Sequence, residues 1–344
     1  GGVPALAPVL VLLNQELHKP GFMLCPAIIS TFLGAQISAV LEKLEASRSD
    51  AAITFSAKNM FKMSGISHIP TLMLDNTDRN RTSPFAFTGN KFEFRMLGSA
   101  NSIACCNIML NAAVAESLKQ YADKLEKAED FEAALHDLIQ STIKAHRRII
   151  FNGNGYDDAW IEEATEKRGL LNLRTTPDAL PRILDPKNVA MLTGHKVFSE
   201  AEIESRCEIM LDNYCKTVHI EAQTMIDMAR KQILPAVESY AAKLAETLAT
   251  KKALSPLLGG KYETSLLTKL SGLTDDIAEA ADALEASLVA YHKIGDVTEA
   301  ACFIRDEVLP KMDALRAPAD EAERFTAAEY WPFPTYGDLL FGVK

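Results

Sequence analysis

The sequence is organised around residues 78–95, which read Asp78-Arg79-Asn80-Arg81-Thr82-Ser83-Pro84-Phe85-Ala86-Phe87-Thr88-Gly89-Asn90-Lys91-Phe92-Glu93-Phe94-Arg95. In the second half of this stretch, charged and aromatic residues alternate, as they do along a strand whose successive side chains point to opposite faces of a sheet. The charged face carries Lys91, Glu93 and Arg95, spaced about 7 Å apart in an extended chain. The aromatic face is predicted to pack against a core.

Two further arginines, Arg79 and Arg81, precede the strand with the same two-residue spacing. Four cations around one carboxylate suit a site for phosphate and carboxylate groups, with Glu93 available to hold a divalent metal ion. A strand with one apolar and one charged face is, however, most often a solvated edge of a sheet. The pattern alone favours that second interpretation.

Composition sets limits on the class of protein. The chain has 344 residues, a formal net charge of -10 and no block of Lys or Arg, which argues against nucleic acid as a partner. Its six cysteines include no C-x-x-C pair, which favours a reducing, cytoplasmic compartment. The apolar segment Val3–Leu13 is too short to span a bilayer and follows no basic residue, so neither a membrane span nor a secretory signal is expected.

The first hundred residues predict a small β-containing region. Apolar spacing predicts a helix from Pro26 to Ala46, and Ile66–Leu74 reads as a strand. Residues 47–64 are predicted to be mostly loop. Thr88-Gly89-Asn90 has turn chemistry that can join two strands. We therefore predict an α+β fold with a partial catalytic domain over residues 1–102.

Residues 103–344 predict a helical region. Ser99–Ser102 can cap a helix beginning near Ile103, with an inner stripe at Ile108, Ala112, Ala115 and Leu118. A second helix is predicted over 130–148, with Phe131 and Leu138 facing inward. A long helical run is predicted from the capping box at Ser199–Glu202 to Thr250, with a kink near Pro235. A helical hairpin is predicted over 274–315, with an interruption near Pro310.

The glycine loop Phe151–Asp158 lies between these helices. It lacks the Lys and Ser/Thr of a phosphate-binding P-loop and the spacing of a dinucleotide fingerprint. A turn that connects two elements is therefore the favoured interpretation. Glu200 and Glu202 mimic a carboxylate pair, but their place at a helix start is typical of capping.

Residues 80–95 resemble the type III glutamine synthetases, and the resemblance extends well beyond them. Similar segments are Gly98–Asn101, Phe151–Tyr156 followed by Trp160, Trp331–Pro334 and Leu339–Phe341, so the resemblance covers about residues 26–344. It implies a cytoplasmic, ATP-dependent ligase. ATP would phosphorylate the γ-carboxylate of glutamate, and ammonia would displace the phosphate to form glutamine. The implied cofactors are ATP and Mg²⁺ or Mn²⁺, and the implied assembly is a dodecamer of two hexameric rings.

The resemblance also assigns roles to residues. Arg81 matches an arginine that binds ATP phosphates, and Lys91 falls where other family members usually carry an arginine near phosphate. Glu93 matches a metal-binding carboxylate, and Arg95 matches the arginine that holds the glutamate carboxylate or the transferred phosphoryl group. Arg79 is added from its spacing alone. With the resemblance, the functional interpretation becomes the favoured one for Arg81, Glu93 and Arg95.

The sequence also departs from the family pattern. The paired metal-binding glutamates and the glycine-rich motif with a metal-binding histidine have no recognisable counterpart in this sequence. We therefore expect the chain not to be catalytically complete by itself. The alternative is a non-catalytic helical assembly module or a relative that binds nucleotide without turnover.

Overall fold

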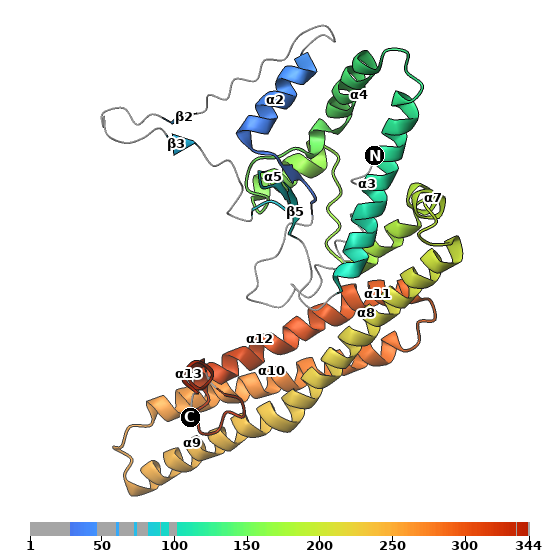
Figure 1. The fold of residues 1–344 in the computed structure, drawn as a ribbon. Helices are drawn as coiled ribbons and strands as arrows, with labels where there is room; N and C mark the ends of the chain where they lie inside the picture. Colours follow the sequence, from blue (N-terminus) through green and yellow to red (C-terminus); the bar gives the residue numbers. More distant parts are fainter. Residues whose placement is uncertain are drawn as a thin grey trace. The chain divides into compact units, whose positions relative to one another are not determined.

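The computed structural model describes residues 28–46, 60–61, 72–73, 82–89, 91–95, 102–334 and 336–342. Within these ranges the fold is α+β, as predicted, with short strands early in the chain and helices after them (Figure 1). By compactness the chain divides into two units, residues 1–207 and 208–344, and the division falls inside a helix. The predicted boundary after residue 102 separates a β-containing region from a helical region and not two compact units, and it stays a prediction.

The strands form two small sheets. Three of them pair in the order β1–β4–β5, with bounds Thr31–Phe32, Phe85–Phe87 and Phe92–Phe94. β1 is parallel to β4, and β4 is antiparallel to β5 in a register that places Ala86 opposite Glu93. The second sheet pairs β2 (Met60–Phe61) with β3 (Leu72–Met73).

A tight turn joins β4 to β5, which confirms the prediction for Thr88-Gly89-Asn90. The backbone N–H of Thr88 donates to the carbonyl oxygen of Lys91 at 2.8 Å. Gly89 has a φ of 97°, a left-handed value that glycine adopts without steric cost. Local turn chemistry therefore fixes the register that brings Glu93 opposite Ala86.

The helix predicted over residues 26–46 begins later than expected, because α2 spans Gly34–Ala46. Thr31 and Phe32 form β1 instead, since a β-branched and an aromatic residue fit a strand and β4 lies beside them. The chain turns at Gly34, which has a φ of 77°. The side-chain oxygen of Asn152 then accepts the backbone N–H groups of Leu33 and Gly34 at 3.0 Å each, which satisfies donors that a helix start leaves unpaired.

Two other early predictions are met only in part. β3 lies inside the predicted strand Ile66–Leu74, and the rest of that segment is outside the described residues. β2 lies in the segment that was predicted to be loop. Each strand is two residues long and is held in place by backbone pairing with the other strand. The propensity of one segment alone does not reveal such a pairing.

The remaining elements of the first unit are helical. They are α3 (Ile103–Leu125), α4 (Phe131–His146), η2 (Arg147–Ile149), α5 (Asp158–Glu162), η3 (Glu163–Lys167), α6 (Thr176–Ala179), η4 (Leu180–Leu184) and α7 (Pro186–Gly194). The Ser102 hydroxyl caps α3 by accepting the backbone N–H of Ala104 at 3.2 Å, as predicted. Asp130 caps α4 in the same way.

The predicted inner stripe of α3 is only partly correct. Its buried residues are Cys106, Met109, Ala112 and Ala113, whereas Leu118 is exposed. The second half of α3 is mostly solvent-exposed, so the apolar period there does not mark a buried face. In α4, Leu138 is buried as predicted, but Phe131 at the first helical position is exposed.

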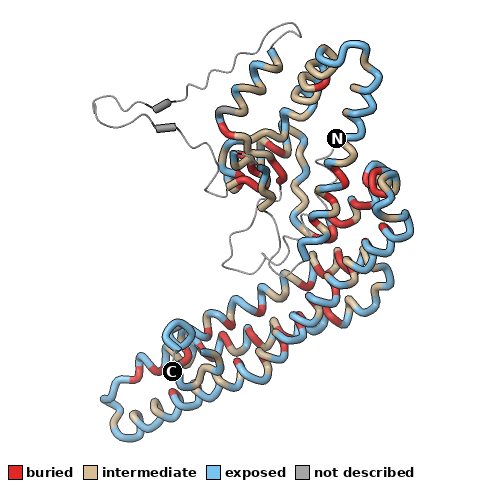
Figure 2. Tube along the Cα trace, viewed as in Figure 1, coloured by how far each residue is buried: buried red, intermediate tan, exposed pale blue. Residues whose placement is uncertain are grey.

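The second unit is built from long helices. Its elements are α8 (Glu200–Met228, which begins in the first unit), η5 (Ala229–Ile233), α9 (Leu234–Leu254), α10 (Lys261–Tyr291), α11 (Val297–Phe303), η6 (Ile304–Val308), α12 (Leu309–Phe325) and α13 (Tyr336–Phe341). α10 packs against both α9 and α12 (Figure 1). Its buried residues Ile277, Ala281, Leu284 and Leu288 confirm the predicted seam, and Figure 2 shows such buried positions along one side of the helices.

Both predicted interruptions in these helices are single π-helical turns placed just before a proline. η5 precedes Pro235, and η6 precedes Pro310. A proline cannot donate to the carbonyl four residues back, so the regular ladder fails there. In each case the N–H one residue before the proline donates five residues back, from Leu234 to Ala229 and from Leu309 to Ile304. The helices continue past the prolines at the cost of one widened turn.

Candidate functional site

The charged row on β5 forms two ion pairs that share one carboxylate. Lys91 Nζ lies 3.4 Å from Oε1 of Glu93, and Arg95 Nη2 lies 3.3 Å from Oε2. The three side chains differ in exposure, because 65% of Lys91 is exposed, 40% of Glu93 and 15% of Arg95. Each carboxylate oxygen thus faces a different cation, which confirms that the three side chains share one face of the strand.

The Glu93 carboxyl is held in its ionised form. Burial acts to raise its pKa, but the hydrogen bonds and positive charges of Arg95 and Lys91 outweigh burial and set the pKa below its ordinary value. The row therefore carries fixed charges of alternating sign at neutral pH. Arg79 and Arg81 lie outside the described residues, so their predicted approach to this row stays a prediction.

Substituting Lys91 with Met should raise the pKa of Glu93. Lys91 favours the ionised carboxylate, so its loss moves the titration of Glu93 toward the ordinary glutamate range. The stabilisation from the ion pairs is present above the unfolded-state pKa and is lost as the pH falls through the folded-state pKa, so the variant should lose it at a higher pH than the wild type. A carboxyl NMR titration measures this shift. An unchanged Glu93 pKa would contradict the pairing.

The aromatic face of the hairpin differs from its prediction. Phe85 stacks on Phe92 with ring centroids 5.2 Å apart, and Phe87 and Phe94 complete the group of rings. Phe92 nevertheless stays 48% exposed, whereas Ala86, opposite Glu93, is fully buried. In the described part of the chain the phenylalanine side chains therefore cluster with one another without being fully buried, and the fully buried Ala86 lies on the face that carries Glu93.

The glycine loop after α4 packs on the same sheet, as the turn interpretation predicts. The backbone N–H of Phe151 donates to Thr31 at 3.0 Å, and that of Gly155 donates to the carbonyl of Thr82, just before β4, at 2.9 Å. A Cβ at Gly153 would come within 2.4 Å of the Phe151 ring, so a larger residue there would require this ring, which stacks on Trp160, to shift. These bonds support the loop as a structural connection.

Two residues that hold this loop were missed by the sequence reasoning. Arg168 donates from Nη1 to the carbonyl of Ile150 at 2.9 Å, pairs with Glu163 at 2.6 Å, and lies 4.8 Å over the ring of Trp160. Asn152 bonds the start of α2 and donates from Nδ2 to the Ser38 hydroxyl at 2.8 Å. Most of these contacts join residues 18 or more positions apart in the sequence, so no local spacing could have revealed them.

The capping interpretation is confirmed for Glu202, and Glu200 lies in the first turn of α8. Glu202 Oε2 accepts from the Ser199 backbone N–H at 2.8 Å, and the Ser199 hydroxyl accepts from the backbone N–H of Glu202 at 3.3 Å. The described residues contain no group of three or more His, Cys, Asp or Glu side chains that could hold a metal ion. Within the described row, Glu93 is therefore a single candidate ligand. No helix in these ranges is long and apolar enough to cross a membrane.

Fold and site together define an α+β protein whose small sheet presents a strand with a row of paired charges. Residues 134–252 match the family described as glutamine synthetase C-terminal domain. A glutamine synthetase of Butyrivibrio fibrisolvens is 37% identical over 327 residues, covering 93% of this chain and 45% of that protein. A glutamine synthetase of Bacteroides fragilis is also 37% identical, covering 92% and 44%, and a type-3 glutamine synthetase of Dictyostelium discoideum is 32% identical, covering 92% and 43%.

Residues 134–252 are therefore a glutamine synthetase C-terminal domain, and the chain is similar to glutamine synthetases over most of its length. This confirms the resemblance noted in the sequence. The chain spans a little under half the length of these relatives.

Proposed function

We propose that this chain contributes part of the active site of a cytoplasmic glutamine synthetase, which joins ammonia to glutamate at the expense of ATP. The γ-carboxylate of glutamate attacks the terminal phosphorus of ATP, ADP leaves, and ammonia then displaces phosphate from the γ-glutamyl phosphate. The observation that carries the proposal is the Lys91–Glu93–Arg95 row, because a reaction between anions needs fixed cations and an ionised carboxylate in one place.

The residues of the row take different parts in this proposal. Arg95 is the most enclosed and is already oriented by Glu93, so it suits a bidentate grip on the glutamate carboxylate or the transferred phosphoryl group. Lys91 is exposed and flexible, and it suits a point charge near phosphate. Arg81, and more weakly Arg79, would add cations for the ATP phosphates.

Glu93 is the residue that would hold Mg²⁺ or Mn²⁺. Its carboxylate is ionised and offers hard oxygen donors, which fits an ion bound through one or two carboxylates together with substrate phosphates. Such a metal neutralises the charge that develops on the transferring phosphoryl group. Both Glu93 oxygens are paired to cations here, so metal binding would require Lys91 and Arg95 to turn toward the phosphate groups instead.

The assembly is proposed to be a homododecamer of two hexameric rings, in which the remaining metal ligands come from other parts of the protein. Sedimentation of the protein as its gene encodes it tests this size. A monomer under conditions that support activity would exclude the assembly.

The activity itself is tested with that same protein, glutamate, ammonia and Mg-ATP. Equal amounts of glutamine and phosphate should appear, and omission of ammonia or metal should stop glutamine formation. A folded protein that binds Mg-ATP but forms no glutamine would instead support the helical assembly module that retains a nucleotide site.

A further inference from the structure

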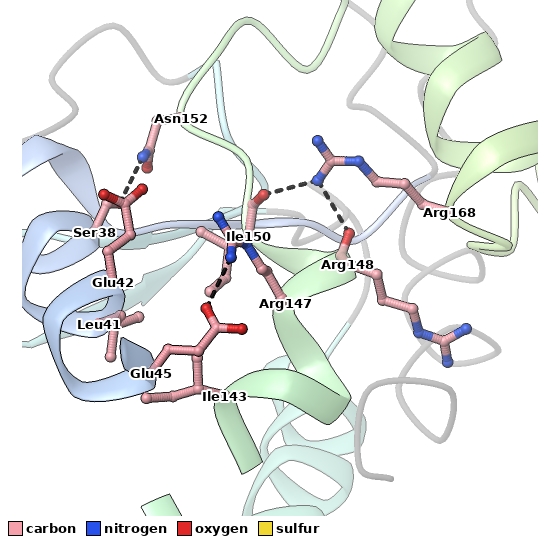
Figure 3. A pocket seen from close by; sticks show the side chains of 10 residues that line it. All are labelled: Ser38, Leu41, Glu42, Glu45, Ile143, Arg147, Arg148, Ile150, Asn152 and Arg168. Carbon is pink, nitrogen blue, oxygen red and sulfur yellow. Dashed lines mark hydrogen bonds and ion pairs between the residues drawn. The ribbon is translucent and has the colours of Figure 1, made fainter. Parts of the chain in front are cut away.

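A cavity of about 490 Å³ lies between α2 and the segment that follows α4 (Figure 3). Its volume is within the range of small-molecule sites, which is about 300–1,000 Å³. The cavity is outside the charged row of β5. Its wall residue Ile150 bridges to Thr31 of β1, and β4 lies between β1 and β5.

One wall of the cavity is acidic. Glu42 and Glu45 are three residues apart on α2 and so share a face of the helix. Glu45 is already paired, because its Oε2 lies 2.8 Å from Nη1 of Arg147. Glu42 is exposed, and its carboxylate forms no ion pair or hydrogen bond with the described residues. The cavity therefore has one anion without a cation partner in this part of the chain.

The opposite wall carries three arginines, of which one is available to a ligand. Arg168 is committed to backbone carbonyls and to Glu163, and Figure 3 shows the Arg148 side chain directed away from the other lining residues. Arg147 uses one nitrogen for Glu45, and 60% of its side chain is exposed. A guanidinium has five N–H donors, so Arg147 can bind a carboxylate as well.

The rest of the lining is apolar or neutral. Leu41, Ile143 and Ile150 are half-buried and provide aliphatic surface. The lining includes no aromatic ring on which a base could stack. Ser38 accepts a hydrogen bond from Asn152 at 2.8 Å and keeps a second lone pair for another donor.

From this arrangement we infer that the cavity binds a free amino acid with an aliphatic side chain, as its zwitterion. The carboxylate is held by Arg147, the ammonium group by Glu42 with the Ser38 hydroxyl, and the side chain by the aliphatic surface. A phosphate or a dicarboxylate would leave the Glu42 carboxylate without a cation partner and would be repelled by it, and a nucleotide would find no stacking partner. The site would allow an amino acid to bind away from the β5 row.

The probe is L-leucine, titrated by calorimetry into the whole protein without ATP or metal, so the result does not depend on the ligase activity. L-leucine should bind saturably below about 10 mM, and 3-methylbutylamine and 4-methylpentanoate, which each lack one charged group, should bind at least about 10-fold more weakly. Glu42→Gln should weaken L-leucine binding by a similar factor. Glu132→Gln, an exposed change on α4 outside the cavity, should leave it unchanged.

Glu42→Lys supplies a positive result that a folding defect cannot imitate. It should reverse the preference, so that 4-methylpentanoate binds more tightly than L-leucine. Absence of saturation by L-leucine, equal binding by the two single-charge analogues, or equal L-leucine affinity in Glu42→Gln and wild type would each overturn the inference.

Discussion

Glutamine formation should fall by about 100-fold or more when Glu93 is replaced by Gln, while the size of the assembly stays the same. Gln keeps the shape of the side chain but removes the negative charge that pairs with Lys91 and Arg95 and that would hold the metal. Losing one fixed electrostatic group at a reacting centre costs about 10²–10³ in rate. Glu93→Ala should be at least as inactive, and the metal concentration needed for half-maximal activity should rise in both variants.

The matched control is Glu204→Gln. Glu204 is exposed on α8 and forms no ion pair with the described residues, so its replacement changes the net charge by the same amount without altering the row. Activity and metal dependence should match those of the wild type. Wild-type activity in Glu93→Gln, measured beside this control, would remove Glu93 from the active site.

The charged row could be predicted because it depends on local geometry. Alternation along β5 and the turn at Gly89 determine which side chains share a face, and both are visible within ten residues of sequence. The seam of α10 and the cap at Ser199 are likewise set by spacing along one helix. Pro235 and Pro310 predicted the interruptions because a proline lacks the N–H that would complete the hydrogen bonding of its own helical turn.

Features that depend on distant pairing could not be predicted in this way. Thr31 and Phe32 carry helix-like apolar spacing into α2, but their strand forms because β4, some 54 residues later, supplies a partner. Leu118 fits an apolar period, yet it is 60% exposed in the described part of the chain. Arg168 holds the glycine loop through backbone carbonyls, which have no sequence signature.

Trp160 is the residue whose loss should most destabilise the first unit. It is 2% exposed, stacks on Phe151 with ring centroids 3.7 Å apart, and packs with Ile28 and Ala164 beneath the loop. Trp160→Ala removes the ring from all these contacts and should cost about 3–5 kcal/mol in the free energy of unfolding. Trp160→Phe should cost much less, because the indole N–H has no hydrogen-bond partner among the described residues and a ring is kept against Phe151.

The chain has two tryptophans, Trp160 in the first unit and Trp331 in the second, so the unfolding of the two units can be followed separately. In Trp160→Ala, fluorescence comes from Trp331 alone and should report unfolding at the wild-type denaturant concentration. Far-UV circular dichroism should show an additional loss of helix at lower denaturant, from α4, α5 and their neighbours. A single unshifted transition by both signals would show that the Trp160 stack does not stabilise this unit, and a joint shift of both would show that the two units unfold together.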